Sequence, residues 1–339
     1  MVHSVDIHGK GIASACCAHL LEKRAVPVTI RAVERAPVPA IVLSDPALAL
    51  LRDVFDRPRL FADRPRIDRR IVSWGGRDPV VLPHGAIVVS ERDLDEALFA
   101  PQAKGAGASV AAEGAADFAL LTAPPFPSGA PRRFGARRAT AVAVRMADPE
   151  ERSACRVEAT DEGWLFLMPT GDGEGWLLGV GAGVTDLLAH SRFVAPKVAL
   201  AGAESAAFDT CPRLLPALCG EGWLACGTAA IAFDPICGDG TAQAVREAIL
   251  AAALLRALDE GEPPEALRTH YESLMIAAMR RHLRLCADFY RSGGTGAWWR
   301  GQLEALLEGY RWCTERLATL PEPRYGLQGF RLVARAAAA

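Results

Sequence analysis

The first 35 residues constrain the fold of this chain more than any other stretch. Residues Val2 to Ile7 alternate as a short strand does, a glycine turn follows, and a helix is predicted from Ala13 to about Arg24. A second strand is predicted from Pro27 to Val33. A strand, a tight turn, a helix and a second strand in this order form a dinucleotide-binding unit, whose two strands lie parallel in one sheet. The chain therefore begins as an α/β protein.

The turn has the pattern Gly-x-Gly-x-x-Ser, from Gly9 through Gly11 to Ser14. The two glycines permit the tight turn and let the backbone approach a pyrophosphate, and serine is small enough to let the helix pack on the strand. Glu34 follows about twenty residues later, where an acidic side chain accepts hydrogen bonds from a ribose. The alternative is a chance turn with an exposed glutamate, but its place between two strands favours nucleotide binding.

A second glycine-rich stretch runs from Gly222 to Leu258. A short apolar strand, Trp223 to Cys226, leads to a turn at Gly227. A loop containing Asp234-Pro235 then precedes an apolar helix that Thr241 opens. Such a loop bares backbone N–H groups, and the helix N-terminus adds partial positive charge. The stretch therefore predicts a site for a polar or anionic ligand.

The middle of the chain predicts a second, antiparallel sheet. Three apolar or alternating segments supply its strands: Ala139–Met146, Glu162–Met168 and Gly175–Val180. The interval from Val184 to Ala207 is predicted to be helical, and two long amphipathic helices are predicted after Gly261. We expect a discontinuous nucleotide-binding domain (residues 1–36, 85–135 and 222–260), a substrate domain (37–84 and 136–221) and a C-terminal helical segment (261–339).

Composition excludes several classes of protein. A formal charge of −2 gives no reason to expect nucleic acid or an anionic membrane as a partner, and no apolar run is long enough to span a bilayer. The chain does not start with the basic and apolar regions of a signal peptide. The nine cysteines form no CxxC pair, which argues against a disulfide framework or a metal site. We expect a cytoplasmic protein with reduced thiols.

Three further segments complete a family resemblance. Ser90 to Leu98 is similar to the R-x-L helix motif, Glu162 to Pro169 to a strand of the halogenase substrate sheet, and Ala232 to Gly240 to the DPxxGxG loop. Together with the N-terminal turn, and in this order, they resemble the FAD-dependent monooxygenases of the aromatic-hydroxylase and tryptophan-halogenase superfamily. The region of Tyr290 and Trp298-Trp299 is similar to the C-terminal segment of the halogenase branch.

The resemblance implies FAD as the cofactor. It implies a Rossmann-type FAD-binding domain interleaved with an antiparallel-sheet substrate domain, followed by C-terminal helices. The DPxxGxG loop would hold the isoalloxazine edge, and Arg92 would lie near the phosphates. The residues expected to bind FAD are Gly9, Gly11, Ser14, Glu34, Arg35, Arg92, Thr228, Asp234, Pro235, Gly238, Gly240 and Thr241.

The sequence departs from the superfamily in three places. Thr228 follows Gly227 where an aspartate is usual, and a hydroxyl holds a ribityl group more weakly than a carboxylate does. The strand motif Trp-x-Trp-x-Ile-Pro of the halogenases becomes Trp164-x-Phe166-x-Met168-Pro. None of the four lysines falls where halogenases carry the lysine that relays hypohalous acid. These departures disfavour halogenation and allow weaker FAD binding.

The flavin itself is the reagent in this superfamily, so catalytic side chains are few. His84 could act as a base towards a phenol or indole, or be a hydrogen-bonded histidine at a strand end. Asp234 could orient its loop or act directly, and Cys237 could touch the flavin or simply pack. An arginine-rich segment is either a solvated face or a site for an anionic substrate. Trp164, Phe166 and Met168 line the substrate pocket or fill the sheet core.

The expected activity is hydroxylation of an aromatic ring by way of a flavin C4a-hydroperoxide. Within the halogenase-like branch, the chain most resembles enzymes that modify a tryptophan of a partner protein or peptide during quinone cofactor biogenesis. The expected partners are that aromatic substrate and an external flavin or nicotinamide reductant. The alternatives are a flavin-dependent halogenase and a degenerate flavoprotein that acts as a binding or maturation protein.

Overall fold

A mostly parallel sheet forms the centre of the half that is predicted to bind a nucleotide. The computed structural model describes residues 2–99 and 116–335. The sheet order is β15 (Cys219–Gly220), β16 (Trp223–Ala225), β6 (Phe118–Leu121), β1 (Val5–His8) and β2 (Val28–Arg31). All neighbours are parallel except β15 and β16. The carboxyl ends of β1, β6 and β16 therefore meet at one edge, where ligands of open α/β sheets bind.

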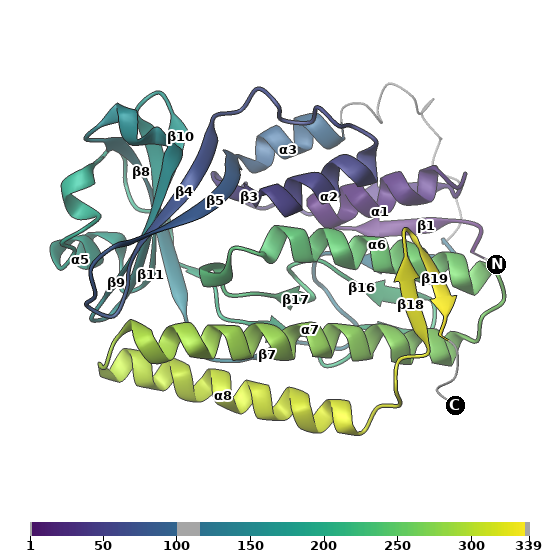
Figure 1. Ribbon diagram of the computed structural model, residues 1–339. Coiled ribbons are helices and arrows are strands. Elements are labelled where there is room, and N and C mark those ends of the chain that lie inside the picture. The colour runs from purple at the N-terminus through teal and green to yellow at the C-terminus, as the bar shows by residue number, and fades with distance from the viewer. Residues whose placement is uncertain (1, 100–115, 336–339) are drawn as a thin grey trace.

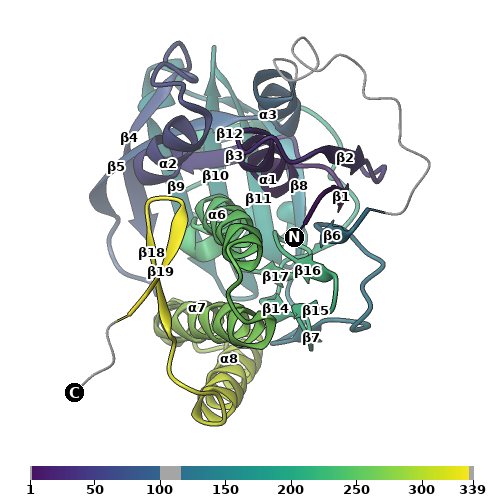
Figure 2. The ribbon, with the colours of Figure 1, turned by 90° about the vertical axis from the view of Figure 1, so that its right-hand side faces the viewer.

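Small side chains let two helices pack closely against each other beside this sheet (Figures 1 and 2). Helix α1 (Ile12–Glu22) buries a run of alanine, serine and cysteine from Ala13 to Ala18. Helix α6 (Gly240–Asp259) is buried along most of its length. Two further helices, α2 (Asp45–Phe55) and α3 (Glu91–Leu98), each begin at a serine N-cap that accepts a backbone hydrogen bond.

The second sheet is long and mostly antiparallel. Its order is β12 (Val198–Leu200), β8 (Arg138–Met146), β11 (Glu174–Gly181), β10 (Gly163–Gly171), β9 (Ala154–Thr160), β4 (Arg66–Ser73), β5 (Val80–Val89) and β3 (Ile41–Ser44), and β13 (Phe208–Asp209) also pairs with β8. Successive residues of β10 face opposite sides, as in any strand. Trp164, Phe166 and Met168 join the main core, whereas Leu165 and Leu167 pack beneath α5 (Val184–Ala189).

The C-terminal part closes one side of the molecule. Helices α7 (Pro264–Gly293) and α8 (Ala297–Ala318) run antiparallel along the bottom of Figure 1 and lie together in Figure 2. A hairpin of β18 (Tyr325–Gln328) and β19 (Arg331–Ala334) follows. A small antiparallel sheet consists of β17 (Ile231–Ala232), β14 (Arg213–Leu214) and β7 (Arg132–Arg133).

The predicted fold class is confirmed, but one element is wrong. In the interval 184–207 only α5 is an α-helix. Pro196 lies in a short 3-10 turn, Ala195–Lys197, and Val198–Leu200 pairs with the edge of β8 instead. A free sheet edge nearby outweighed local helix preference. The predicted domain boundaries stay a prediction, although β5 runs through the one placed between residues 84 and 85. No helix among the described residues is both long and apolar enough to span a bilayer.

Candidate functional site

The two predicted glycine turns, at Gly9 and at Gly227, lie where the parallel strands β1 and β16 end. Backbone hydrogen bonds join the strand ends there, from Gly9 N to Arg31 O, from Thr122 N to His8 O and from Cys226 N to Leu121 O. The N-termini of α1 and α6 begin close to this edge, after Gly11 and Asp239. Neither helix has a side-chain hydrogen bond at its N-cap. Both therefore keep uncapped N–H groups that can donate hydrogen bonds to an anionic ligand.

Gly9 and Gly11 have the backbone conformations that the turn requires. Their φ angles are +119° and +128°, in the region that favours glycine. A Cβ on Gly9 would lie 2.3 Å from the Thr122 hydroxyl oxygen, so this glycine is required by the fold itself. Ser14 is fully buried, and its hydroxyl lies 2.7 Å from that of Thr122. Ser14 thus ties α1 to the end of β6, which is a structural role beside the predicted one.

A carboxylate faces Gly11 where the resemblance places phosphate. Glu91 Oε1 lies 3.7 Å from the position of a Cβ on Gly11, and Arg35 Nη2 lies 3.9 Å from it. Arg35 grips Glu91 with both ends of its guanidinium, with Nη1 at 2.8 Å from Oε2, and Val38 N donates to the same oxygen at 2.8 Å. This part of the site therefore contains a closed ion pair instead of free positive charge.

Arg92 points away from this place. It is exposed on α3, whereas Glu91, Leu94 and Leu98 form the buried face of that helix. Glu34 is exposed after β2, so its carboxylate is accessible to a ligand. The role of Arg92 at the phosphates stays a prediction, but the residue of α3 beside Gly11 is Glu91.

The loop from Ala232 to Gly240, which is predicted to hold the isoalloxazine edge and is called the flavin-side loop below, is open where α6 begins. Asp234 caps a short 3-10 turn, Pro235–Cys237, which ends at Gly238 with φ of +65°. A Cβ on Gly240 would meet nothing within 4 Å, and Thr241 beside it is partly exposed. A Cβ on Gly238 would lie 3.3 Å from Arg70 Nη2. The loop thus presents backbone to a space that Arg70 borders.

A buried acid stands behind the turn at Gly227. Thr228 is exposed, and its backbone oxygen accepts a hydrogen bond from Arg213. Gly227 N donates to Glu247 Oε2 at 2.7 Å, and burial raises the pKa of Glu247 to about 8. Glu247 was not predicted, because it lies in the middle of an apolar helix where its partner is a backbone group twenty residues away.

Asp234 is directed into the protein. Its carboxylate lies 2.8 Å from Arg137 Nε, and both side chains have no exposed surface. Tyr290 donates to Asp234 Oδ2 at 2.9 Å, and Trp164 Nε1 donates to the Tyr290 hydroxyl at 3.2 Å. His282 Nε2 accepts from Asp234 N at 2.7 Å. This network holds the loop in place, so its carboxylate is already engaged within the chain.

His84 is paired with an arginine. Arg70 Nη2 lies 3.0 Å from His84 Nε2, and because arginine only donates, Nε2 must accept and the proton must sit on Nδ1. Burial lowers the pKa of His84, and the charge of Arg70 lowers it further. His84 is thus a neutral ring whose Nε2 lone pair is in use, which makes it a poor base. This geometry supports the interpretation of His84 as a hydrogen-bonded histidine.

Arg70 brings the predicted pocket and the flavin loop together. Its guanidinium lies 5.7 Å from the centroid of the Phe166 ring, and its Nε is buried without a hydrogen-bond partner. Phe166 and Met168 are each 6 % exposed and Trp164 is 1 % exposed. Trp164 belongs to the Asp234 network, whereas Phe166 faces Arg70. The sequence indicated Arg70 only as one of many arginines.

Comparison with solved structures identifies the architecture. The chain superposes on the flavin-dependent halogenase CmlS with a TM-score of 0.76 at 16% sequence identity, covering 94% of this chain and 71% of that one. The fold is that of the flavin-dependent halogenases and monooxygenases. The peptidyl tryptophan dihydroxylase QhpG is similar over 89% of this chain and 79% of its own, with a TM-score of 0.68 and 20% identity.

A monooxygenase of the same fold is also similar. PqsL from Pseudomonas aeruginosa, described as a probable FAD-dependent monooxygenase, has a TM-score of 0.62 at 14% identity over 92% of this chain and 99% of its own. No family model and no curated protein matches the sequence. The predicted likeness in fold is confirmed.

The two ends of the site fit FAD to different degrees. The flavin end offers the open N-terminus of α6 and a polar side chain, Arg70, with an unused buried donor. At the other end, Glu34 is free to meet a ribose, and α1 has an uncapped N-terminus. The Arg35–Glu91 pair beside Gly11 opposes a pyrophosphate, because Glu91 neutralises the charge of Arg35. The residues fit a flavin dinucleotide, with Glu91 weakening its phosphate end.

Proposed function

We propose that this protein is an FAD-dependent monooxygenase that hydroxylates an aromatic ring. The observation that carries the proposal is the flavin-side loop, where a Cβ on Gly240 would meet open space and Arg70, whose guanidinium lies 5.7 Å from the centroid of the Phe166 ring, borders Gly238. When bound, reduced flavin supplies the chemistry that activates dioxygen. The chain binds and orients the reactants and excludes water from them.

Arg70 and Phe166 are the residues we assign to the substrate side. Phe166 offers an aromatic face for stacking, and the Arg70 guanidinium, 5.7 Å from the centroid of that ring, brings positive charge and N–H donors beside it. His84 positions Arg70 by accepting from its Nη2. A substrate with an electron-rich ring and a nearby acceptor, such as a peptide carbonyl, satisfies both groups.

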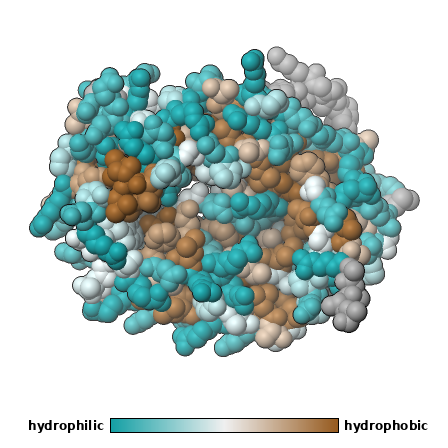
Figure 3. Space-filling view, in the orientation of Figure 1, coloured by the Kyte–Doolittle hydropathy of each residue, from teal (hydrophilic) through white to brown (hydrophobic). Residues whose placement is uncertain are grey.

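The edge of β5 favours a peptide as the substrate. β3 pairs only with residues 86–89 of β5, so residues 80–85 have no strand on that side among the described residues. Val80, Val81 and Leu82 are exposed by 55%, 59% and 45%. Figure 3 shows apolar side chains over the β4–β5 hairpin on the left of that face. An extended peptide can add to such an edge, and β5 leads from it to His84.

These features support modification of a peptidyl tryptophan, as in quinone cofactor biogenesis, over free small molecules. The similar protein QhpG is a peptidyl tryptophan dihydroxylase by its name. Halogenation is the weaker candidate. The described lysines Lys10, Lys23 and Lys197 form ion pairs with Asp95, Asp56 and Glu151, and none of them lies beside Arg70 and Phe166 on the proposed substrate side.

Flavin binding is the first test. Purified protein should carry FAD or take it up on titration, and the reduced complex should add one or more oxygen atoms to a tryptophan-containing peptide in the presence of bromide. A brominated product would identify a halogenase. A colourless protein that quenches no flavin fluorescence at any FAD concentration would overturn the enzyme and leave a binding or maturation protein.

A further inference from the structure

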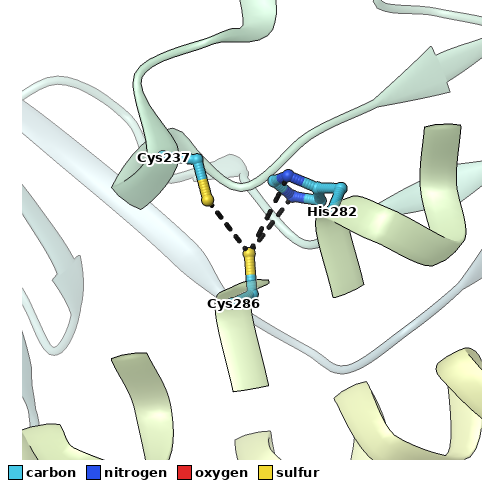
Figure 4. A group of neighbouring side chains, drawn as sticks. All are labelled: Cys237, His282 and Cys286. Atoms are coloured by element: carbon cyan, nitrogen blue, oxygen red, sulfur yellow. Dashed lines mark hydrogen bonds between the residues drawn. The ribbon is translucent and has the colours of Figure 1, made fainter. Parts of the chain in front are cut away.

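Two cysteines meet behind the flavin-side loop. Cys237 Sγ, at the end of the 3-10 turn, lies 3.5 Å from Cys286 Sγ on α7. His282, one helical turn before Cys286, places its ring beside the second sulfur, with Nε2 at 3.3 Å (Figure 4). All three ligand atoms lie within 4.8 Å of one another, which also makes the cluster a geometric candidate for a metal.

The hydrogen bonds of His282 argue against a metal. Its Nε2 accepts from Asp234 N at 2.7 Å, so that lone pair is in use and the neutral ring carries its proton on Nδ1. Burial lowers the pKa of His282 to about 3, which keeps the ring neutral. To bind a metal through Nδ1, the ring would have to lose its bond to the flavin loop. Three protein ligands would also be one short of a closed zinc site.

The sulfur contact itself suits a different chemistry. A disulfide needs the two sulfurs to approach to about 2.05 Å. Cys237 is the last residue of the short 3-10 turn and is followed by Gly238 with a left-handed φ, so it lies at the end of an element and not within a long helix as Cys286 does. Cys237 is partly exposed, whereas Cys286 is buried. Access from solvent therefore distinguishes the two thiols.

We propose that Cys237 and Cys286 are a redox-active dithiol that hydrogen peroxide converts to a disulfide, joining the flavin-side loop to α7. The Cys237 sulfur attacks peroxide, the O–O bond breaks, and Cys237 becomes a sulfenic acid as one water leaves. Cys286 then attacks this sulfur, the S–O bond breaks, and a second water leaves. The two thiols lose two electrons and two protons, and peroxide is reduced to two waters.

That the protein itself produces the peroxide rests on the proposed function. Reduced flavin that meets oxygen without a substrate yields hydrogen peroxide in the same site. The disulfide would then cross-link the loop that carries Asp234, and so mark enzyme that has turned over without substrate. The cysteine chemistry itself needs only the peroxide, so it can be tested without flavin.

A second cysteine pair supplies an internal control. Cys17 and Cys226 bring their sulfurs to 4.0 Å, but both are fully buried between α1 and β16. Because peroxide has to reach a sulfur before it reacts, this pair should stay reduced under conditions that oxidise Cys237. If the distance between the sulfurs alone decided which cysteines are oxidised, Cys17 and Cys226 would be oxidised together with Cys237 and Cys286.

The test uses the full chain, fully reduced, freed of reductant and treated with an equimolar amount of hydrogen peroxide. We expect the number of thiols titrated after denaturation to fall from nine to seven, because two of the nine free cysteines join. After trypsin, the peptide 285–291 should be linked to the peptide 214–246, with fragmentation locating the bond at Cys237. Cys286→Ser should abolish the link and leave a sulfenic acid on Cys237 that dimedone labels.

Other outcomes would overturn the proposal. These are nine thiols after peroxide, a link at Cys219 or Cys226 instead of Cys237, or equal oxidation of Cys17 and Cys226. Native mass spectrometry after incubation with zinc chloride tests the rival. One tightly held zinc that protects Cys237 and Cys286 from alkylation until a chelator is added would assign the cluster to a metal. Apart from the Cys286→Ser experiment, these measurements are made on the unmutated chain and do not depend on the folding of a variant.

Discussion

The N-termini of α1 and α6 have similar backbones but different surroundings. Both helices start after a loop with glycines at the carboxyl edge of the parallel sheet, and neither has a side-chain cap. At the first residue of α6, a Cβ on Gly240 would meet nothing within 4 Å. In front of α1, the Glu91 carboxylate and its partner Arg35 stand beside Gly11. One anion site is open, and the other already contains an anion from the chain.

This difference teaches that backbone motifs and side-chain chemistry can be altered separately. The Gly-x-Gly turn keeps its backbone geometry because Gly9 is required by contact with Thr122, whatever binds in front of it. The charge at the same place depends on one residue of α3. A chain can therefore keep the appearance of a dinucleotide site while changing how strongly it holds phosphate.

The largest effect is expected at the flavin end, from removing the anchor of the loop. Asp234→Ala leaves Arg137 buried without its counter-ion, which costs about 3–5 kcal/mol of unfolding free energy. Urea denaturation measures the loss. Asp234→Asn, which keeps the shape and an acceptor for Tyr290, should lose less. Equal midpoints for the wild type and Asp234→Ala would show that the loop does not depend on this ion pair.

The acid behind the Gly227 turn should make stability depend on pH. The folded protein raises the pKa of Glu247 to about 8, above its ordinary value, so it favours the protonated form. The stabilising contribution of Glu247 is then fully present below about pH 4.3. Above that pH the free energy of unfolding falls as pH rises towards 8, by about 1.4 kcal/mol per pH unit at most. Glu247→Gln should flatten this slope between pH 5 and 9. A slope that the substitution leaves unchanged would assign the pH dependence to other groups.

Removing the negative charge before α1 should strengthen FAD binding. Glu91→Gln keeps the side-chain shape but frees Arg35, and we expect about tenfold tighter FAD binding, equivalent to about 1.4 kcal/mol. Fluorescence titration measures it. Riboflavin, which has no phosphate, should bind both proteins equally.

Two results would contradict the assignment of Glu91. One is the same gain for riboflavin as for FAD. The other is a large loss of FAD affinity in Arg92→Gln, because Arg92 is exposed on the other face of α3. The second result would instead support the sequence-based placement of Arg92 at the phosphates.

A smaller effect is expected at the mouth of α6. Gly240→Ala adds a methyl group where the protein has open space, so the fold should be unaffected. The methyl would stand between the helix N-terminus and a bound flavin, and we expect FAD affinity to fall by about tenfold or less, up to about 1.4 kcal/mol. Gly301→Ala, also in open space but on α8, is the matched control. Equal affinities for both variants would move the flavin away from α6.

Local sequence patterns predicted the fold better than they predicted the site. The strand–turn–helix unit and the apolar alternation on β10 depend on neighbours along the chain, and the structure has both. The orientation of α3 was predictable too, since Leu94 and Leu98 share a helical face with Glu91 and leave Arg92 outside. Matching a motif to Arg92 overlooked that periodicity.

Partners distant in sequence were beyond such patterns. Arg137 and Asp234 come from a strand junction and a loop nearly a hundred residues apart, and only the packing of α7 brings Tyr290 to them. The approach of Cys286 to Cys237 likewise depends on the place of α7 against the flavin loop. The interval 184–207 failed for a related reason, because the free edge of β8 lies far from it in sequence.

The open edge of β5 also bears on how this protein behaves at high concentration. An uncovered strand with Val80, Val81 and Leu82 can pair with the same strand of another copy as readily as with a peptide. Pro79 precedes this triplet and Pro83 follows it, and proline has no N–H with which to extend a ladder. The prolines thus act as gatekeepers. They leave an edge long enough to hold a short segment and too short to seed a growing fibre.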